Sequence, residues 1–262
     1  MGAGTATTGP PLEAAPGHGW FVYGVVESGA GLPEGLTGVE GSPVRLAGHG
    51  PLAAVVGEID LERTTGRRAD LVAYSEVLNA LAASMAVAPV RFGTVLLDGE
   101  AIVEDLLVPQ SDQLTGLLAE LAGRSQVNLR ASFHEPVVLA EVVSEDPEVR
   151  RLHELTRDLP EEAAYAERVR LGELVARALE GKREIEAAAL LDSVLPFVAS
   201  YSLREGGGPD HVLDVALLVD DDRLAALEDH LEQLAEALHE RVRLRMVGPI
   251  AAYDFVGGEP WG

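Results

Sequence analysis

The chain contains no cysteine among its 262 residues. Disulfide bonds, thiolate nucleophiles and zinc sites built on thiolates are therefore excluded. No apolar run approaches the roughly 20 residues that a membrane-spanning helix needs, so we expect no membrane span. The N-terminus has no basic segment followed by an apolar one, so we expect no secretory signal. These absences favour a cytoplasmic protein.

Basic residues are also scarce, with 20 Lys and Arg against 43 Asp and Glu and a formal net charge of -23. This balance repels phosphate backbones and anionic lipid head groups, so binding to nucleic acid or to a membrane surface is not expected. The chain is nevertheless 47% hydrophobic and 24% charged, which supplies a proper core. Its length suits one large domain or two modest ones.

The first part of the chain reads as a tail followed by strands. Residues 1–18 are mostly Gly, Ala, Thr and Pro, which predicts a disordered tail. Aromatic and β-branched residues at 20–27 predict a strand. A β-hairpin is expected from 44–47 and 52–59, with the turn at 48–51.

Residues 70–107 predict a helix, a short extended run and a second helix. The apolar face of the first helix is expected to carry Leu71, Tyr74, Leu78, Leu81 and Met85. Pro89 is expected to stop this helix, because proline disfavours a helical conformation in the residue before it. Residues 90–95 then read as a mostly buried extended run. Asp98-Gly99 turns the chain and can cap the second helix.

Arg91, Phe92 and Gly93 in this run are candidate structural or partner-binding residues. Arg91 stands among apolar residues, so we predict that it is mostly buried and paired with a carboxylate. The alternative is a functional one, in which Arg91 clamps an anion or a carboxylate of a partner.

Residues 126–247 follow the order strand, helices, strand, strand, helix, strand. The strands are expected at 126–133, 199–203, 212–219 and 242–247. Residues 136–198 are helical in pattern, and Gly181 is expected to separate two helices that pack as a hairpin. The order is that of a ferredoxin-like βαββαβ domain with the hairpin inserted in its first connection. The fold class is thus α+β, with a tail at 1–18, an N-terminal α+β domain at 19–124, the ferredoxin-like domain at 125–247 and a C-terminal segment at 248–262.

The C-terminal segment is too apolar to remain in water. We predict that 248–256 packs back on the body, with Tyr253 and Phe255 buried. Pro249, Tyr253 and Phe255 are further structural or partner-binding candidates, and the alternative for the two aromatics is a platform for a ligand.

No motif in the chain points to catalysis or to a bound cofactor. A Gly-x-Ser-x-Gly nucleophile elbow and a P-loop are both missing from the sequence. Asp220-Asp221-Asp222 has a metal-binding reading, but acidic residues that open a helix more simply cap its amides and meet the positive end of its dipole. We therefore predict no catalytic residue, no metal and no cofactor.

Several short motifs, each on its expected element, together carry a family resemblance. They are Tyr23-Gly24-Val25-Val26, Leu52-Ala53-Ala54-Val55-Val56, Pro89-Val90-Arg91-Phe92-Gly93-Thr94-Val95, Arg170-x-Gly172-Glu173-Leu174-Val175, Asp214-Val215-Ala216-Leu217-Leu218-Val219 and Gly248-Pro249-x-x-x-Tyr253-x-Phe255-Val256. In this order the chain resembles the gas vesicle synthesis proteins of the L/F family, over residues 20–256.

The resemblance implies a non-enzymatic accessory protein for the assembly of gas vesicles, the gas-filled protein shells that give buoyancy. The implied partners are the small hydrophobic shell-forming subunit and other accessory proteins, and the implied location is the cytoplasm and the gas vesicle. The alternative function is a regulatory module that binds a small molecule on its ferredoxin-like domain.

Overall fold

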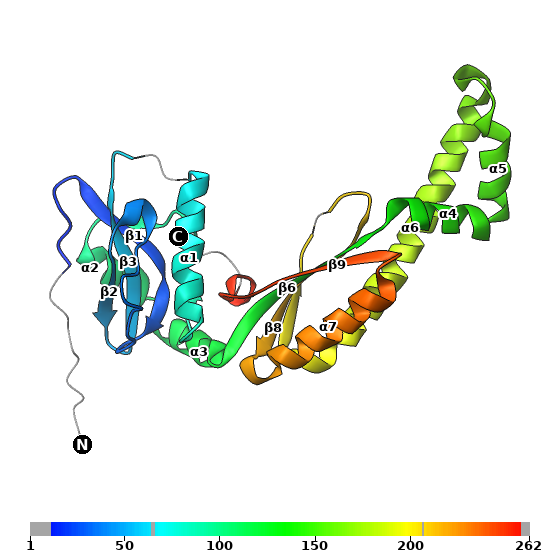
Figure 1. The fold of residues 1–262 in the computed structure, drawn as a ribbon. Helices are drawn as coiled ribbons and strands as arrows, with labels where there is room; N and C mark the ends of the chain where they lie inside the picture. Colours follow the sequence, from blue (N-terminus) through cyan, green and yellow to red (C-terminus); the bar gives the residue numbers. More distant parts are fainter. Residues whose placement is uncertain (1–11, 64–65, 206, 258–262) are drawn as a thin grey trace. The chain divides into compact units, whose positions relative to one another are not determined.

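The computed structural model describes residues 12–63, 66–205 and 207–257 (Figure 1). The chain divides into two compact units. Unit 1 comprises the chain up to Val127 and again from Gly248, and unit 2 is Asn128–Val247. The C-terminal segment thus belongs to unit 1. Residues 1–11 and 258–262 of the predicted terminal segments lie outside the described residues.

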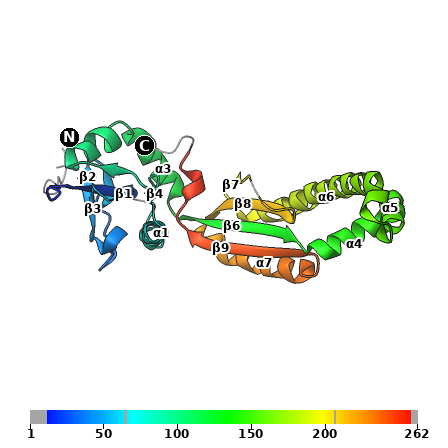
Figure 2. The same cartoon turned by 90° about the horizontal axis from the view of Figure 1, so that it is seen from above.

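Unit 1 is built on one sheet, in the order β2-β3-β1-β4, with β5 also paired to β1. Its strands are β1 (His18–Glu27), β2 (Val44–His49), β3 (Leu52–Asp60), β4 (Ala88–Pro89) and β5 (Val95–Leu96). The long central strands β1 and β3 are antiparallel and lie side by side in Figures 1 and 2. The strand expected at 20–27 and the expected hairpin are both confirmed.

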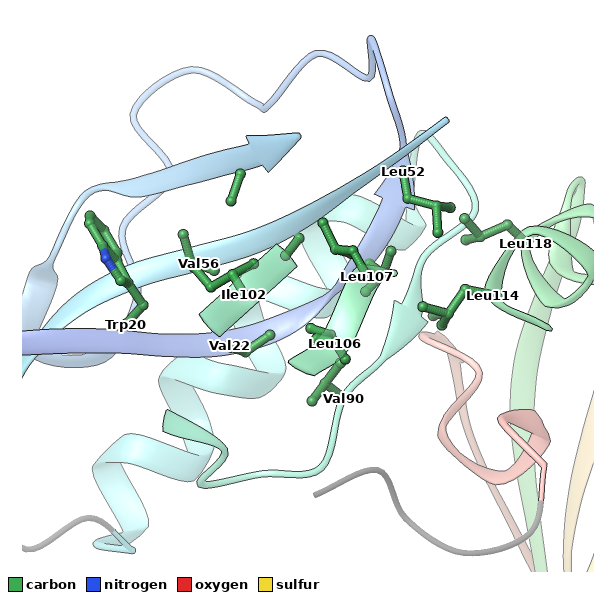
Figure 3. Packing of buried hydrophobic residues seen from close by; sticks show 14 residues of the cluster. Trp20, Val22, Leu52, Val56, Val90, Ile102, Leu106, Leu107, Leu114 and Leu118 are labelled. Atoms are coloured by element: carbon green, nitrogen blue, oxygen red, sulfur yellow. The ribbon is translucent and has the colours of Figure 1, made fainter. Parts of the chain in front are cut away.

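Both faces of this sheet are covered by apolar side chains. On one face, the irregular helix η2 (Ile102–Leu107) and α3 (Ser111–Leu121) pack against Trp20, Val22 and Val56 (Figure 3). Asp98 caps the short helix α2 (Gly99–Ala101) that precedes η2, as expected, through a 2.8 Å bond from the Ala101 N–H.

The other face is covered by α1 (Arg68–Ala82). Its buried apolar side chains are Tyr74, Val77, Leu78 and Leu81. The prediction was wrong at both ends of this helix: Leu71 is 48% exposed, and Met85 lies beyond the last turn. The helix ends at Ala82, well before Pro89, because the residues up to Val87 are needed to connect it to β4.

The predicted disorder of 1–18 is wrong for its described residues. Leu12 and Ala14 pack against the apolar cluster of η2 and α3. The Ala15 N–H donates a 2.8 Å hydrogen bond to Glu58, and His18 already begins β1. Two apolar side chains in a small-residue segment are thus enough to dock it.

A buried ion pair fixes the start of α1. Asp70 is 2% exposed and accepts a 2.7 Å bond from Arg63 and a 3.0 Å bond from the Arg67 N–H. Arg63 also pairs with Glu40 at 2.7 Å. Burial acts to raise the pKa of Asp70, but the bonds from Arg63 and Arg67 outweigh it and hold that pKa below its ordinary value.

Unit 2 contains a four-stranded sheet in the order β7-β8-β6-β9. The strands are β6 (Arg124–Phe133), β7 (Ser200–Leu203), β8 (His211–Asp220) and β9 (Val242–Ile250). Numbered along the chain this order is 2-3-1-4, the arrangement of a ferredoxin-like sheet. The predicted fold class is confirmed.

The connection from β6 to β7 is the expected helical insertion, but its hairpin differs from the prediction. It runs through α4 (Glu135–Glu145) and α5 (Pro147–Arg157), and returns along the 30-residue helix α6 (Tyr165–Val194). Gly181 lies inside α6 and does not break it. A glycine within a helix costs only about 1 kcal/mol, which packing of α6 against α4 and α5 offsets.

Charged side chains attach this hairpin to the sheet. Lys182 of α6 bonds to Glu141 and Glu145 of α4 at 3.0 and 2.8 Å. Arg241 joins the same network through Glu141 at 2.8 Å and also pairs with Glu186. Burial acts to raise the pKa of Glu141, but Lys182 and Arg241 hold it below its ordinary value.

In the parts of the chain that the structure describes, no helix is long and apolar enough to cross a membrane. The same residues hold no group of three or more His, Asp or Glu side chains placed to bind a metal ion. The helix α7 (Leu224–Leu238) lies along the sheet of unit 2 (Figure 2), and its Leu227 and Leu231 are buried.

We predict that Asp70→Ala lowers the free energy of unfolding by up to about 3–5 kcal/mol at neutral pH, because it leaves the largely buried Arg63 paired only with the more exposed Glu40. Since the folded-state pKa of Asp70 lies below its unfolded value, its contribution is present above about pH 4 and is lost as the pH falls through the folded pKa. Denaturant titrations of both proteins from neutral pH to pH 3 measure this. Glu76→Ala, at an exposed position of the same helix, is the control; an equal loss in both variants would contradict the prediction.

Candidate functional site

Two candidate motifs that are far apart in sequence pack on one side chain of unit 1, Tyr74. Phe92, from the motif after α1, lies with its ring centroid 5.3 Å from that of Tyr74. Tyr253, from the C-terminal motif, lies 6.2 Å from the same ring. Phe21 of β1 contacts Phe92 from the sheet at 6.0 Å. We call Phe21, Tyr23, Tyr74, Phe92 and Tyr253 the aromatic cluster.

Two tyrosine hydroxyls in the aromatic cluster are tied to backbone groups. Tyr23 accepts a 2.8 Å bond from the Val39 N–H, and Tyr74 donates to the carbonyl of Val90. Burial raises the pKa of Tyr23 to about 12, and it also raises that of Tyr74. Both hydroxyls therefore stay protonated at physiological pH, and they hold loops onto the sheet rather than transferring protons.

The motif that contains Arg91, Phe92 and Gly93 forms a tight turn between β4 and β5. The Thr94 N–H and the Thr94 hydroxyl both donate to the Arg91 carbonyl, at 3.2 and 2.8 Å. Gly93 has φ +89°, a conformation that side chains disfavour, which explains the glycine at this place in the turn. The turn directs Phe92 into the aromatic cluster.

The prediction for Arg91 is wrong. Its side chain is exposed, and no described residue forms an ion pair with it. Val90 is buried as expected, but the turn begins at the next residue, so Arg91 faces solvent. An arginine that folding does not use remains a candidate for contact with a partner.

The C-terminal motif returns the chain to unit 1. The Ala251 N–H donates a 3.0 Å bond to the Asn79 side chain of α1. Gln126 and Asp254 are joined by two hydrogen bonds, of 2.5 Å from the Gln126 amide and 3.0 Å from the Asp254 N–H. At Gly248, with φ +155°, an added Cβ would lie 2.8 Å from the Gln126 carbonyl, so only glycine fits this close approach.

The expectation of buried aromatics in this segment needs correction. Tyr253 and Phe255 are half-buried, and Ala251 and Ala252, at 1% and 5% exposure, are the residues that reach the core. Ala251 packs in the apolar cluster that α1 covers, and its bond to Asn79 brings the segment close to that helix, where a small side chain fits. Pro249 is exposed, so of the C-terminal candidates it is the one most open to solvent.

A second candidate site, which the sequence analysis did not single out, is the edge of the unit 2 sheet at β7. The Arg204 N–H donates a 2.9 Å bond to the Asp214 carbonyl, and Ser202 lies opposite Ala216. Hydrogen-bonded pairs alternate in an antiparallel ladder, so the N–H and C=O groups of Tyr201 and Leu203 point away from β8. No described residue pairs with them across that edge.

The same two residues expose apolar side chains, with 44% of Tyr201 and 59% of Leu203 open to solvent. Backbone donors and acceptors therefore lie beside apolar surface, which is the arrangement that accepts an added strand. We call Ser200–Leu203 the β7 edge. Sequence predicted the strand at 199–203, but its position at the end of the sheet follows only from the topology.

The family described as "Gas vesicle synthesis protein GvpL/GvpF" matches residues 19–257. Gas vesicle protein F of Streptomyces sp. (strain CB03234) is 33% identical over 240 residues, covering 90% of this chain and 98% of the relative. Gas vesicle protein L of the same organism is 29% identical over 251 residues, covering 90% and 92%.

Two crystal structures have a similar fold. GvpF from Anabaena sp. PCC7120 superposes with a TM-score of 0.79 at 21% identity, over 92% of this chain and 99% of that one. GvpF from Microcystis aeruginosa gives 0.75 at 20% identity, over 91% and 99%. Both units of the present structure therefore fall within a fold already seen experimentally.

Because the Arg91 side chain is exposed and has no ion pair, Arg91→Ala is expected to leave the melting temperature within about 1 °C of the parent, as exposed substitutions usually do. Thermal unfolding followed by circular dichroism measures this. Tyr74→Phe is the comparison: it removes the hydroxyl bond to Val90 and is expected to cost about 1 kcal/mol. A clear loss of stability on Arg91→Ala would restore the structural role first predicted.

Ending the chain after Ile250 is expected to destabilise the protein, because it removes Ala251 and Ala252 from the core and Tyr253 from the aromatic cluster. Full burial of a large apolar side chain is worth about 1.5–3 kcal/mol, and the half-buried Tyr253 contributes part of that amount. Denaturant unfolding and gel filtration give the readout. A chain ending after Gly257 is the matched control, and it should behave as the full chain. Equal stability of both truncations would show that the segment contributes nothing to unit 1.

Proposed function

Since this chain belongs to the GvpL/GvpF family of gas vesicle synthesis proteins, with a role in gas vesicle formation, we propose that it is a non-enzymatic accessory protein that binds the hydrophobic shell-forming subunit. The observation that carries this proposal is the β7 edge, an unpaired strand edge flanked by two exposed apolar side chains. In this proposal the protein acts in the cytoplasm and at the vesicle.

The binding mode is strand addition at the β7 edge. An incoming strand would pair with the outward N–H and C=O groups of Tyr201 and Leu203, and each such bond is worth about 0.5–1.5 kcal/mol. Apolar side chains of the incoming strand would cover those of Tyr201 and Leu203, which adds burial to the main-chain bonds. A small hydrophobic subunit that assembles into a shell supplies both features.

The charge of the chain supports a holding role. A net charge of -23 keeps a complex with an aggregation-prone partner dispersed through mutual repulsion. The short length of β7, four residues, limits the contact to a few main-chain bonds. A contact of this size releases its partner readily, as delivery of a subunit to a growing shell requires.

Binding of other accessory proteins is also part of the proposal, and exposed Arg91 and Pro249 in unit 1 are candidates for it. The proposed lack of catalysis rests on the motifs missing from the sequence and on tyrosine hydroxyls committed to backbone groups. The alternative remains a small-molecule module. A hollow lined by Val142, Ala178 and Ile185 opens between the helices of the insertion.

The test is co-expression with the shell subunit of the same gene cluster, followed by affinity capture and gel filtration. The double variant Tyr201→Lys/Leu203→Lys places two lysines on the β7 edge, a device by which natural edges avoid pairing. Loss of both apolar contacts is expected to weaken capture about tenfold or more. The matched control is Tyr165→Lys/Ile185→Lys, which changes two exposed apolar residues of α6 by the same charge.

Capture that survives in the parent and the α6 control but falls in the β7 variant supports the proposal. Equal capture by all three proteins would remove the β7 edge from it. A shell subunit that stays insoluble and never co-purifies with the parent would remove the binding function itself. Since the contact is apolar and main-chain, capture is expected to persist when salt is raised to about 0.15 M, where exposed charges are largely screened beyond about 8 Å.

A further inference from the structure

In a chain with few basic residues, one face of the unit 2 sheet gathers several of them. Along β6, the buried side chains Leu129, Ala131 and Phe133 alternate with Arg130 and Ser132, which are not buried. The buried set faces the helices, since Phe133 lies under Arg241, which pairs with Glu141 and Glu186 of α4 and α6. Figures 1 and 2 show α6 and α7 along this side of the strands. Arg130 therefore lies on the opposite, helix-free face.

The edge strand β9 contributes two more arginines to this face. Its burial alternates, with Val242 and Leu244 more buried than Arg243 and Arg245, which are both exposed. β9 is the neighbour of β6, and the His134 N–H bonds to the Arg241 carbonyl at 2.8 Å where the two strands meet. Arg243 and Arg245 form no ion pair with any residue in the described ranges.

Asp214 of β8 marks the middle of the same face. Arg130 donates to it at 2.9 Å, and Arg204, at the end of β7, lies 3.5 Å from it. Arg204 also donates a 2.8 Å bond to Asn128 of β6. These contacts tie three strands together on the helix-free face and hold two guanidinium groups around one carboxylate. We call Arg130, Arg204, Arg243 and Arg245 the arginine face.

The charge of this face opposes that of the molecule. The face carries four arginines, of which Arg130 and Arg204 contact the carboxylate of Asp214, and a second carboxylate, that of Asp220, stands at the end of β8. The whole chain has 43 acidic and 20 basic residues, so the excess of positive charge here is a local reversal. Two of the arginines are not needed for any ion pair that folding makes among the described residues, which points to a partner.

We propose that the arginine face docks an acidic segment of another polypeptide, that is, a run of Asp and Glu side chains. Guanidinium groups match carboxylates in two-point hydrogen bonds, and arginine is the residue suited to such contacts. Several strands present the groups, so an extended segment can cross the sheet from β7 to β9. A long nucleic acid is disfavoured because its phosphates would extend beyond the patch into the field of a protein of charge -23.

This inference does not depend on the proposed binding of the shell subunit. The arginine face uses side chains on the helix-free side of the sheet, whereas the β7 edge uses outward main-chain groups and the side chains of Tyr201 and Leu203. The two contacts also differ in their dependence on salt. Binding to the arginine face is expected to weaken as salt rises because it is electrostatic, whereas strand addition at the β7 edge is not.

The probe is a fluorescein-labelled octaglutamate peptide, with octaglutamine as its uncharged counterpart, and the readout is fluorescence anisotropy with the full chain. Arg243→Glu/Arg245→Glu is the test variant. The matched control is Arg151→Glu/Arg177→Glu, which reverses two exposed arginines of α5 and α6 that have no ion pair with a described residue. Both variants carry the same net charge, so any difference between them reports the place of the charges. Circular dichroism checks that each is folded.

We expect octaglutamate to bind the parent and the control at about 20 mM salt, and the test variant to bind about tenfold more weakly or worse. Binding by the parent should fall steeply by about 0.15 M salt. Arg243→Gln/Arg245→Gln should lie between parent and test variant. No binding to the parent, or equal weakening by both charge reversals, would overturn the inference. Equal or tighter binding of a labelled single-stranded DNA octamer would overturn the assignment to an acidic polypeptide.

Discussion

Unit 1 depends on one constraint: its core is complete only when the end of the chain has returned to it. Ala251 fills a place in the cluster under α1, and Val256 packs against the cluster on the other face of the sheet. The two hydrogen bonds between Gln126 and Asp254 fasten this return beside the point where the chain first leaves unit 1. Unit 2 is therefore an insertion within unit 1, held at both of its ends. Folding of unit 1 can therefore finish only after unit 2 has been synthesised.

This arrangement separates structural from surface roles. The candidate residues that pack, Phe92, Gly93 and Tyr253, stabilise the turn and the returning segment around Tyr74, so their presence is explained by folding. The residues without such contacts lie elsewhere, at Arg91, at the β7 edge, and at Arg243 and Arg245 of the arginine face. Such residues are the better guide to function. A buried contact is accounted for by the stability of the fold, whereas an exposed apolar or unpaired charged side chain indicates a surface that can bind a partner.

Alternation and spacing were enough to predict most strands, and the order of elements predicted the ferredoxin-like sheet. The sequence failed where neighbours in space decide. Arg91 has apolar neighbours in sequence, but the turn closed by Thr94 puts it outside. Gly181 has the low helix propensity expected of a break, yet α6 continues through it because it packs against α4 and α5, and adjacent Lys182 is ion-paired to α4. The exposure of Tyr201 and Leu203 follows from β7 being the last strand of its sheet, and no pattern within four residues encodes that position.

The acidic charge of the chain also explains how an open apolar edge is tolerated. Two copies that approached edge to edge would each bring a charge of -23, so repulsion opposes the self-pairing to which such edges are prone. A small hydrophobic subunit with little charge does not meet this repulsion and can reach the edge. The net negative charge would also repel an acidic partner. The arginine face differs from the rest of the surface in that its positive charge would attract such a partner. In the proposed function, repulsion opposes most encounters, and the β7 edge and the arginine face are the two sites of unit 2 at which a partner would bind.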